Sequence, residues 1–152
     1  MAETGHRIID YLTLTEFAVG LHNSNPENLR IDFTVDQIVN YFAQLKTEGI
    51  SFIVGGYLAA AYYGLQRASP EIELFVRAEY NSLPPFQIRI AFENFDGLFD
   101  NTVEVELATS TIRILSLQDL IEDFKNSENL VKPLDAPVLQ ELVLNLKGYE
   151  VF

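Results

Sequence analysis

The chain has 152 residues, of which 48% are hydrophobic and 21% are charged, and this composition is typical of one globular domain with enough apolar side chains for a core. Its 22 acidic and 10 basic residues give a formal net charge of -12, which argues against stable binding to nucleic acids or anionic membranes, because both require lysine and arginine. Cysteine is absent, which excludes disulfides and thiolate metal sites, and no segment has the apolar length of a signal peptide or membrane span, so we expect one cytoplasmic domain over residues 1–152.

The first clear element is a helix that begins after residue 34. Thr34 and Gln37 are spaced as a capping box, and the apolar residues that follow recur at helical spacing until Gly49, where we expect the helix to end. Residues 1–30 have a weaker pattern. Their apolar residues could form one or two helices, so we expect a helical extension there.

A strand, a glycine turn and a second helix are expected next. Residues 50–54 are mostly apolar and β-branched or aromatic, which predicts a short buried strand. Gly55 and Gly56 form the expected turn, and the alanine-rich residues 57–63 predict a helix that ends at Gly64.

The second half of the chain predicts several further strands and then two helices. Alternation of polar and apolar residues predicts strands over residues 71–76, 86–92, 102–107 and 112–115. A turn is expected at Asp96 and Gly97. Ser116 is expected to cap one helix, and the last helix is expected to begin at Asp135 and Pro137 and to end at Gly148. The predicted fold is therefore α/β (α+β), with a mixed sheet of four to six strands flanked by helices.

Two neighbouring segments carry a resemblance to a known superfamily. The first reads Val54-Gly55-Gly56-Tyr57-Leu58-Ala59, and the second reads Arg67-Ala68-Ser69-Pro70-Glu71-Ile72-Glu73-Leu74. Together they resemble the signature of small bacterial nucleotidyltransferase-fold proteins, such as minimal nucleotidyltransferases and AbiEii-like proteins. In that superfamily a Gly-Gly or Gly-Ser turn opens a helix, and Arg-x-Thr-x-Asp-x-Asp leads into a strand. The resemblance extends over roughly residues 34–146.

The resemblance implies a metal-dependent enzyme that transfers a nucleoside monophosphate from a nucleoside triphosphate to a hydroxyl group. Such transfer uses two divalent ions, Mg²⁺ or Mn²⁺, held by carboxylates. Glu71 and Glu73 are two positions apart in a strand and so share a face, which would let them hold both ions. The resemblance implies that Glu106, or its same-face neighbour Glu104, completes the catalytic metal site.

The nucleotide itself is expected at the glycine turn. Gly55 and Gly56 would let backbone N–H groups approach the triphosphate at the start of a helix. Arg67 would contact a phosphate, and Ser69 stands where the superfamily has threonine. Structural roles are alternatives for all of these residues: a tight turn for the glycines, a local ion pair for Arg67, and the solvent face of a half-buried sheet for the glutamates.

The sequence also departs from the superfamily pattern, and this supports a second hypothesis. Every acidic motif position is Glu where the superfamily has Asp, although Mg²⁺ requires near-ideal octahedral geometry. Lys125, Lys132 and Lys147 are scattered among acidic residues instead of forming a basic cluster. The alternative is a catalytically inactive protein of this fold that acts as a protein-binding, toxin-antitoxin or regulatory module, with an acidic surface suited to a basic partner. If the carboxylates converge without metal, repulsion should raise at least one of their pKa values.

Overall fold

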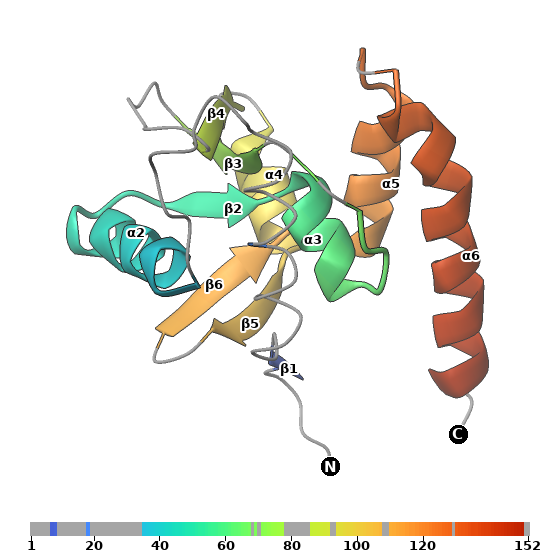
Figure 1. The fold of residues 1–152 in the computed structure, drawn as a ribbon, viewed down its shortest axis with the longest axis horizontal. Coiled ribbons are helices and arrows are strands. Elements are labelled where there is room, and N and C mark those ends of the chain that lie inside the picture. The colour runs from blue at the N-terminus through green and yellow to red at the C-terminus, as the bar shows by residue number, and fades with distance from the viewer. Residues whose placement is uncertain are drawn as a thin grey trace.

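The chain forms helices around one mixed β-sheet (Figure 1). The computed structural model describes residues 7–8, 18, 35–67, 69, 71–77, 86–91, 94–107, 110–128 and 130–150. Six strands are assigned in these ranges: β1 (Arg7–Ile8), β2 (Phe52–Val54), β3 (Ile72–Val76), β4 (Phe86–Ile90), β5 (Val103–Leu107) and β6 (Ser110–Ile114). The helices are α2 (Val35–Thr47), α3 (Gly56–Tyr62), α4 (Phe95–Asp100), α5 (Leu117–Lys125) and α6 (Lys132–Glu150).

The sheet has the strand order β1-β5-β6-β2-β3-β4. The pairs β1–β5, β6–β2 and β3–β4 are parallel, whereas β5–β6 and β2–β3 are antiparallel. This arrangement confirms the predicted mixed sheet of four to six strands flanked by helices. It also places β3 in the interior of the sheet, and all five residues of β3 are buried.

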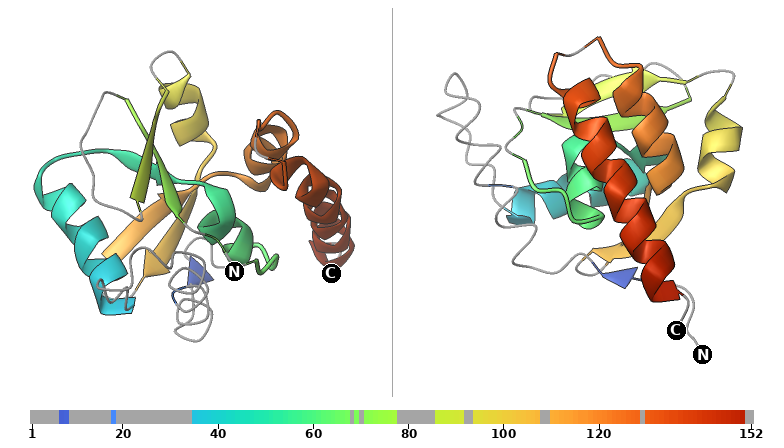
Figure 2. Two further views of the ribbon diagram at one scale, coloured as in Figure 1. Left: turned by 45° about the horizontal axis from the view of Figure 1, so that its top comes forward. Right: turned by 90° about the vertical axis from the view of Figure 1, so that its right-hand side faces the viewer.

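Helices cover both faces of the sheet (Figure 2). On one face, Phe42 of α2 stacks on Phe52 of β2, with 5.4 Å between the ring centroids. On the opposite face, Asp123 of α5 bonds to Arg89 of β4. α5 and α6 lie side by side and pack against each other (Figures 1 and 2). Side chains from β3, β4, α5 and α6 can therefore meet on the α5 face of the sheet.

Local sequence patterns predicted several elements well. α2 lies within the predicted range and ends just before Gly49, although its expected cap, Thr34, lies outside the described residues. Ser116 caps α5 as predicted, because its Oγ accepts a hydrogen bond of 3.0 Å from the Asp119 N–H. The predicted strands and the alanine-rich helix are also present.

Three local predictions were wrong. Arg7 and Ile8 form β1 against β5 where a helix was expected, because pairing with a distant strand outweighs a weak local pattern. Asp96 lies inside α4, so the expected turn at that position is helical. α6 begins at Lys132 because Pro133 fits the first turn, where no N–H is needed, and it continues past Gly148 with Pro137 inside it.

Within the described residues, no helix combines the length and apolarity required to cross a bilayer.

Candidate functional site

Glu73 of β3 lies on the α5 face of the sheet, and its carboxylate is buried and bonded to two cations. The residue is only 4% exposed. Its Oε1 accepts a hydrogen bond of 2.8 Å from Arg89 Nη1, and its Oε2 accepts one from Lys132 Nζ. A buried carboxylate without a counter-charge would be strongly unfavourable, so these two partners explain why Glu73 can remain charged in the interior.

Arg89 links Glu73 to helix α5. In the parallel register between β3 and β4, Arg89 lies opposite Phe75 and shares a sheet face with Glu73. Its guanidinium donates to both carboxylate oxygens of Asp123, at 2.9 and 2.7 Å, and lies over the Phe75 ring at 4.4 Å. Burial lowers the pKa of Arg89, but the ion pairs with Asp123 and Glu73 outweigh this effect and raise the pKa. The side chain is therefore a permanent cation.

Lys132 lies in the first turn of α6 and bonds to the same Glu73 carboxylate. The residue is 6% exposed, and its ammonium lies 5.4 Å from the centroid of the Phe124 ring on α5. Two elements that are far apart in sequence, β3 and α6, are thus joined through Glu73. The three charged groups of Arg89, Glu73 and Lys132 form one ion-pair network with Asp123 at its edge.

Glu71 lies beside this network and precedes β3. Within the described residues its carboxylate forms no hydrogen bond or ion pair. Burial raises the pKa of Glu71, and the negative charge of Glu73 raises it further, while Lys132 and Arg89 partly oppose the shift. A raised carboxylate pKa was expected for acidic groups that lie close together. Glu71 is thus near enough to Glu73 for their charges to interact, but it precedes β3 instead of lying in the strand as predicted. Only Glu73 is paired directly with cations.

A second buried carboxylate, Asp135 of α6, engages the predicted phosphate ligand Arg67. Asp135 accepts a hydrogen bond of 2.7 Å from the Tyr57 hydroxyl and one of 3.2 Å from Arg67 Nε. Burial and the hydrogen bond to Asp135 raise the pKa of Tyr57. Arg67 thus forms the local ion pair that was the alternative to phosphate binding.

The predicted nucleotide-binding residues Gly55, Gly56 and Ser69 face protein groups. A Cβ atom on Gly55 would lie 2.5 Å from the Phe75 ring, so only glycine fits there without a shift. Gly56 has φ +60, and a Cβ on it would lie 3.1 Å from the side chain of Glu73. Ser69 is buried, and its hydroxyl donates to the carbonyl of Glu71 at 2.9 Å. These residues shape the turn and the entry to β3.

Glu104 and Glu106 do not join Glu71 and Glu73. They lie on β5, and the strand order places β6 and β2 between β5 and β3. Three strand spacings correspond to about 14 Å, which is too far for a shared metal site. The predicted catalytic cluster of three carboxylates is therefore not formed. Alternation predicted correctly which residues share a face, but it contained no information about strand order.

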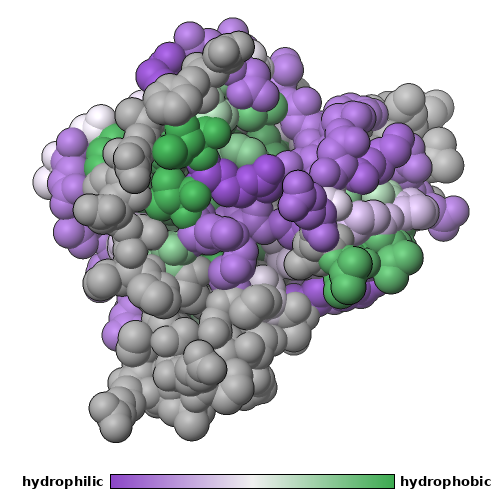
Figure 3. All heavy atoms as spheres, turned by 90° about the horizontal axis from the view of Figure 1, so that it is seen from above, coloured by the Kyte–Doolittle hydropathy of each residue, from purple (hydrophilic) through white to green (hydrophobic). Residues whose placement is uncertain are grey.

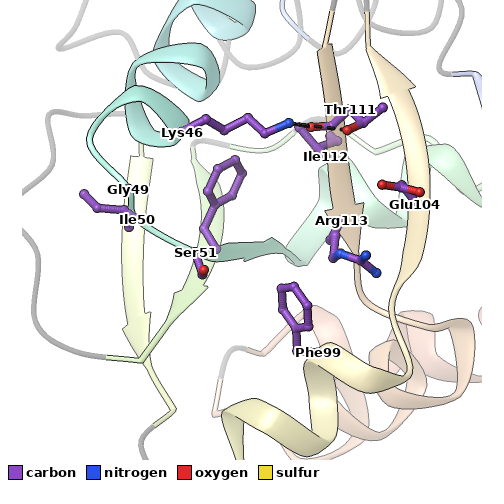
Figure 4. Close-up of a pocket in the computed structure, with 10 residues that line it drawn as sticks. Lys46, Gly49, Ile50, Ser51, Phe99, Glu104, Thr111, Ile112 and Arg113 are labelled. Carbon is purple, nitrogen blue, oxygen red and sulfur yellow. Dashed lines mark hydrogen bonds between the residues drawn. The ribbon is translucent and has the colours of Figure 1, made fainter.

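Glu104 instead lines a separate pocket of ≈ 340 Å³ between α2, β5 and β6 (Figure 4). Two cations line it as well. Lys46 donates to the carbonyl and hydroxyl of Thr111, and Arg113 donates to the Thr102 hydroxyl at 3.1 Å and covers the Phe99 ring at 4.6 Å. Both cations are thus engaged with the protein itself, and Glu106 remains exposed outside this pocket.

The residues present do not fit the two metal ions that the resemblance implies. Both oxygens of Glu73 are bonded to cations, and Glu106 is too distant to contribute. In the described part of the chain, no three His, Asp or Glu side chains come together as a metal site. A second pocket of ≈ 390 Å³ adjoins the network, and its polar lining comes from Arg89, Asn94, Asp119, Glu122, Asp123 and Asn126.

Arg89, Asp123 and Lys132 were the residues that the sequence did not reveal. Arg89 carried a partial signal, because it occupies a polar position in an otherwise apolar, alternating strand. Assigning it to Glu73 required the pairing of β3 with β4. Lys132 carried no signal, since nothing in the local pattern relates it to a residue 59 positions earlier.

Searches with the whole chain against protein-family models, curated proteins and solved structures find no match. The resemblance to nucleotidyltransferase-fold proteins therefore rests on the motif residues of the sequence alone.

Proposed function

We propose that this protein is a non-catalytic binding module, in which an ion-pair network occupies the place of the metal ions of a nucleotidyltransferase-like core, and that its partner is a protein. The observation that carries this proposal is the double pairing of Glu73 with Arg89 and Lys132. These two cations supply the positive charge that divalent ions would otherwise supply.

The chemistry of nucleotidyl transfer explains why this pairing matters. The reaction needs two divalent ions about 4 Å apart, and each ion requires carboxylate oxygens as ligands. A metal ion at Glu73 would have to displace a buried arginine and a buried lysine, each already desolvated and bonded. Glu71 alone offers too few oxygen atoms for two ions.

Protein binding is supported by the surface of the chain. Four large apolar side chains of residues 130–138 are exposed, and exposed apolar side chains that gather on one surface are a mark of protein interaction sites. The net charge of -12 disfavours nucleic acid and favours a basic protein. A toxin-antitoxin or other regulatory pair would meet this description.

An active nucleotidyltransferase is the second candidate, and one observation favours it. Glu71 has a carboxylate that no described residue neutralises directly, and burial together with the charge of nearby Glu73 raises its pKa. In this case a nucleoside triphosphate and Mg²⁺ or Mn²⁺ would bind there.

Nucleotide transfer provides the test between the two candidates. The purified protein is incubated with each labelled nucleoside triphosphate, Mg²⁺ or Mn²⁺, and protein, RNA and small hydroxyl acceptors. We expect no incorporation, and no change in melting temperature with millimolar metal. Incorporation that is lost in Glu73→Gln but retained in Glu106→Gln would overturn the non-catalytic proposal, because Glu106 lies on the exposed surface of β5.

A further inference from the structure

An exposed apolar stripe runs from the α5–α6 connection along the first turns of α6. It consists of Leu130, Val131, Leu134 and Val138, which are 88%, 52%, 74% and 39% exposed. We call these four residues the α6 stripe. Among the described residues, the only other large apolar side chain that is exposed is Ile90, on β4. Figure 3 shows a hydrophobic patch on the side where Figure 1 places α6, with hydrophilic atoms beside it.

The stripe lies on the side of α6 that is exposed to solvent, away from the buried residues of the same turns. Leu134 and Val138 are four positions apart in α6, and Val131 directly precedes the helix, three positions before Leu134, so this spacing directs the three side chains to one side of its first turns. The inward side of the same turns is formed by buried residues, namely Lys132, Asp135, Ala136 and Leu139. The first turns of α6 therefore present one buried side to the domain and a second, apolar side to solvent.

The stripe is held in a fixed position before any partner binds. Lys132 is bonded to Glu73, and Asp135 is bonded to Tyr57, so the inward side of the helix is anchored at two buried points. Its neighbour α5 packs along it. A preformed apolar surface loses little conformational entropy on binding, which favours docking.

The charges around the stripe indicate the chemistry of its partner. Between residues 126 and 142 the sole basic residue is Lys132, which is buried against Glu73. The exposed acidic residues Glu128 and Glu141 lie at the two ends of the stripe. The surface is therefore apolar in its middle and negative at its borders, within a chain of net charge -12.

We infer that the α6 stripe docks an amphipathic helix of another protein, with large apolar residues along one side and lysine or arginine along its borders. A helix is the matching element because anchors at i, i+3 and i+7 on one helix pack between those of another. A second copy of this chain fits poorly, since it would bring its own Glu128 and Glu141 to the acidic borders. This inference rests on the proposed function and names the class of partner.

A synthetic helix can serve as the probe. The peptide has about 18 residues, or roughly 27 Å of helix, with leucine at helical i, i+3, i+4 and i+7 positions and lysine elsewhere. One comparison peptide has the same composition in scrambled order, and another replaces every lysine with glutamate. Fluorescence anisotropy with the full chain, at physiological salt, measures the dissociation constant of each. We expect the leucine–lysine peptide to bind at least about tenfold more tightly than either comparison peptide.

Protein variants then locate the site. Leu134→Gln should weaken binding of the leucine–lysine peptide by about tenfold or more, whereas Ile90→Gln, the matched exposed apolar control, should leave it within about twofold. Glu128→Gln together with Glu141→Gln should weaken binding at low salt more than at high salt, because exposed charges are screened. All variants change exposed side chains, so circular dichroism should confirm an unchanged fold.

Several results would overturn the docking inference. These are equal binding of the scrambled or glutamate peptide, binding unaffected by Leu134→Gln, or a dimer in sedimentation equilibrium that Leu134→Gln dissociates. The last result would make a second copy the occupant. None of them concerns catalysis. Failure of the proposed function would appear instead as nucleotide incorporation that depends on Glu73 and is unchanged by Leu134→Gln.

Discussion

Glu73 of β3 and Lys132 of α6 form a buried ion pair across 59 residues of sequence. The pair joins strand β3 to the helix that carries the exposed α6 stripe. Glu73 also accepts from Arg89 of β4, and Arg89 bonds directly to Asp123 of α5, so one ion-pair network attaches both α5 and α6 to the sheet. Helix α6 therefore belongs both to the buried ion-pair network, through Lys132, and to the proposed docking surface, through the α6 stripe.

Breaking this pair should destabilise the fold. Lys132→Met keeps most of the side-chain volume but leaves Glu73 with one cation, so we expect the free energy of unfolding to fall by about 3 kcal/mol. Glu73→Gln should also destabilise, since it leaves Lys132 buried without its partner. Urea denaturation measures both changes.

The double variant tests whether the two residues act together. Glu73→Gln combined with Lys132→Met should destabilise by clearly less than the sum of the single changes, because in the double variant neither position 73 nor position 132 carries an unpaired charge. Strict additivity would contradict the pairing. Arg77→Ala provides the control, since it removes a solvent-exposed ion pair with Asp96 and should change stability little.

The two hydrogen-bond donors of Asp135, Tyr57 and Arg67, should contribute unequally to stability. Tyr57→Phe removes the hydroxyl that donates to buried Asp135, so it should lower the free energy of unfolding by about 1–3 kcal/mol. Arg67→Ala removes the other partner of Asp135, but the Arg67 side chain is 43% exposed, so the loss should be below about 1 kcal/mol. Chemical denaturation of both variants checks the order. A larger effect of Arg67→Ala would show that its ion pair is the main support of Asp135.

Glu71 should make stability depend on pH in a defined direction. Its folded-state pKa is raised by burial and by the charge of Glu73, so the folded chain holds this proton more tightly than the unfolded chain. Stability is therefore lost as pH rises from the unfolded pKa, about 4.3, through the folded value, and the loss persists at neutral pH.

The corresponding test is Glu71→Gln. This variant should melt at a higher temperature than the parent at pH 7, and the difference should vanish below the unfolded pKa, where both side chains are neutral. Thermal unfolding followed by circular dichroism measures the difference. Glu106→Gln, at an exposed position of β5, is the control and should show no such gain. A gain for Glu71→Gln of equal size at both pH values would refute the electrostatic explanation.

The glycine turn should respond to added side chains as a packing feature. Gly55→Ala places a Cβ against the Phe75 ring, and Gly56→Ala forces a left-handed backbone conformation, so each should destabilise by about 1–3 kcal/mol. Gly97→Ala is the matched control. Its added Cβ meets nothing within 4 Å and lies in α4, so stability should rise by up to about 1 kcal/mol. Denaturation curves that show no loss for Gly55→Ala would contradict the close packing.

The local elements of this protein could be predicted from its sequence, because they depend on interactions between near neighbours. The Ser116 cap of α5, the end of α2 before Gly49 and the alternating strands follow from hydrogen bonding and periodicity over a few residues. The same reasoning correctly predicted a mixed sheet flanked by helices. It also correctly predicted the strand that contains Glu73.

The composition of the site was decided by the tertiary structure alone. Alternation shows which residues share a face within one strand, but strand order depends on packing over the whole chain, and that order separates Glu106 from Glu73 by two strands. The cations that neutralise Glu73 come from β4 and α6, where no local pattern relates them to it. A carboxylate pair that sequence alone associates with metal ions is thus bonded to arginine and lysine, because burial required counter-charges that only distant segments supply.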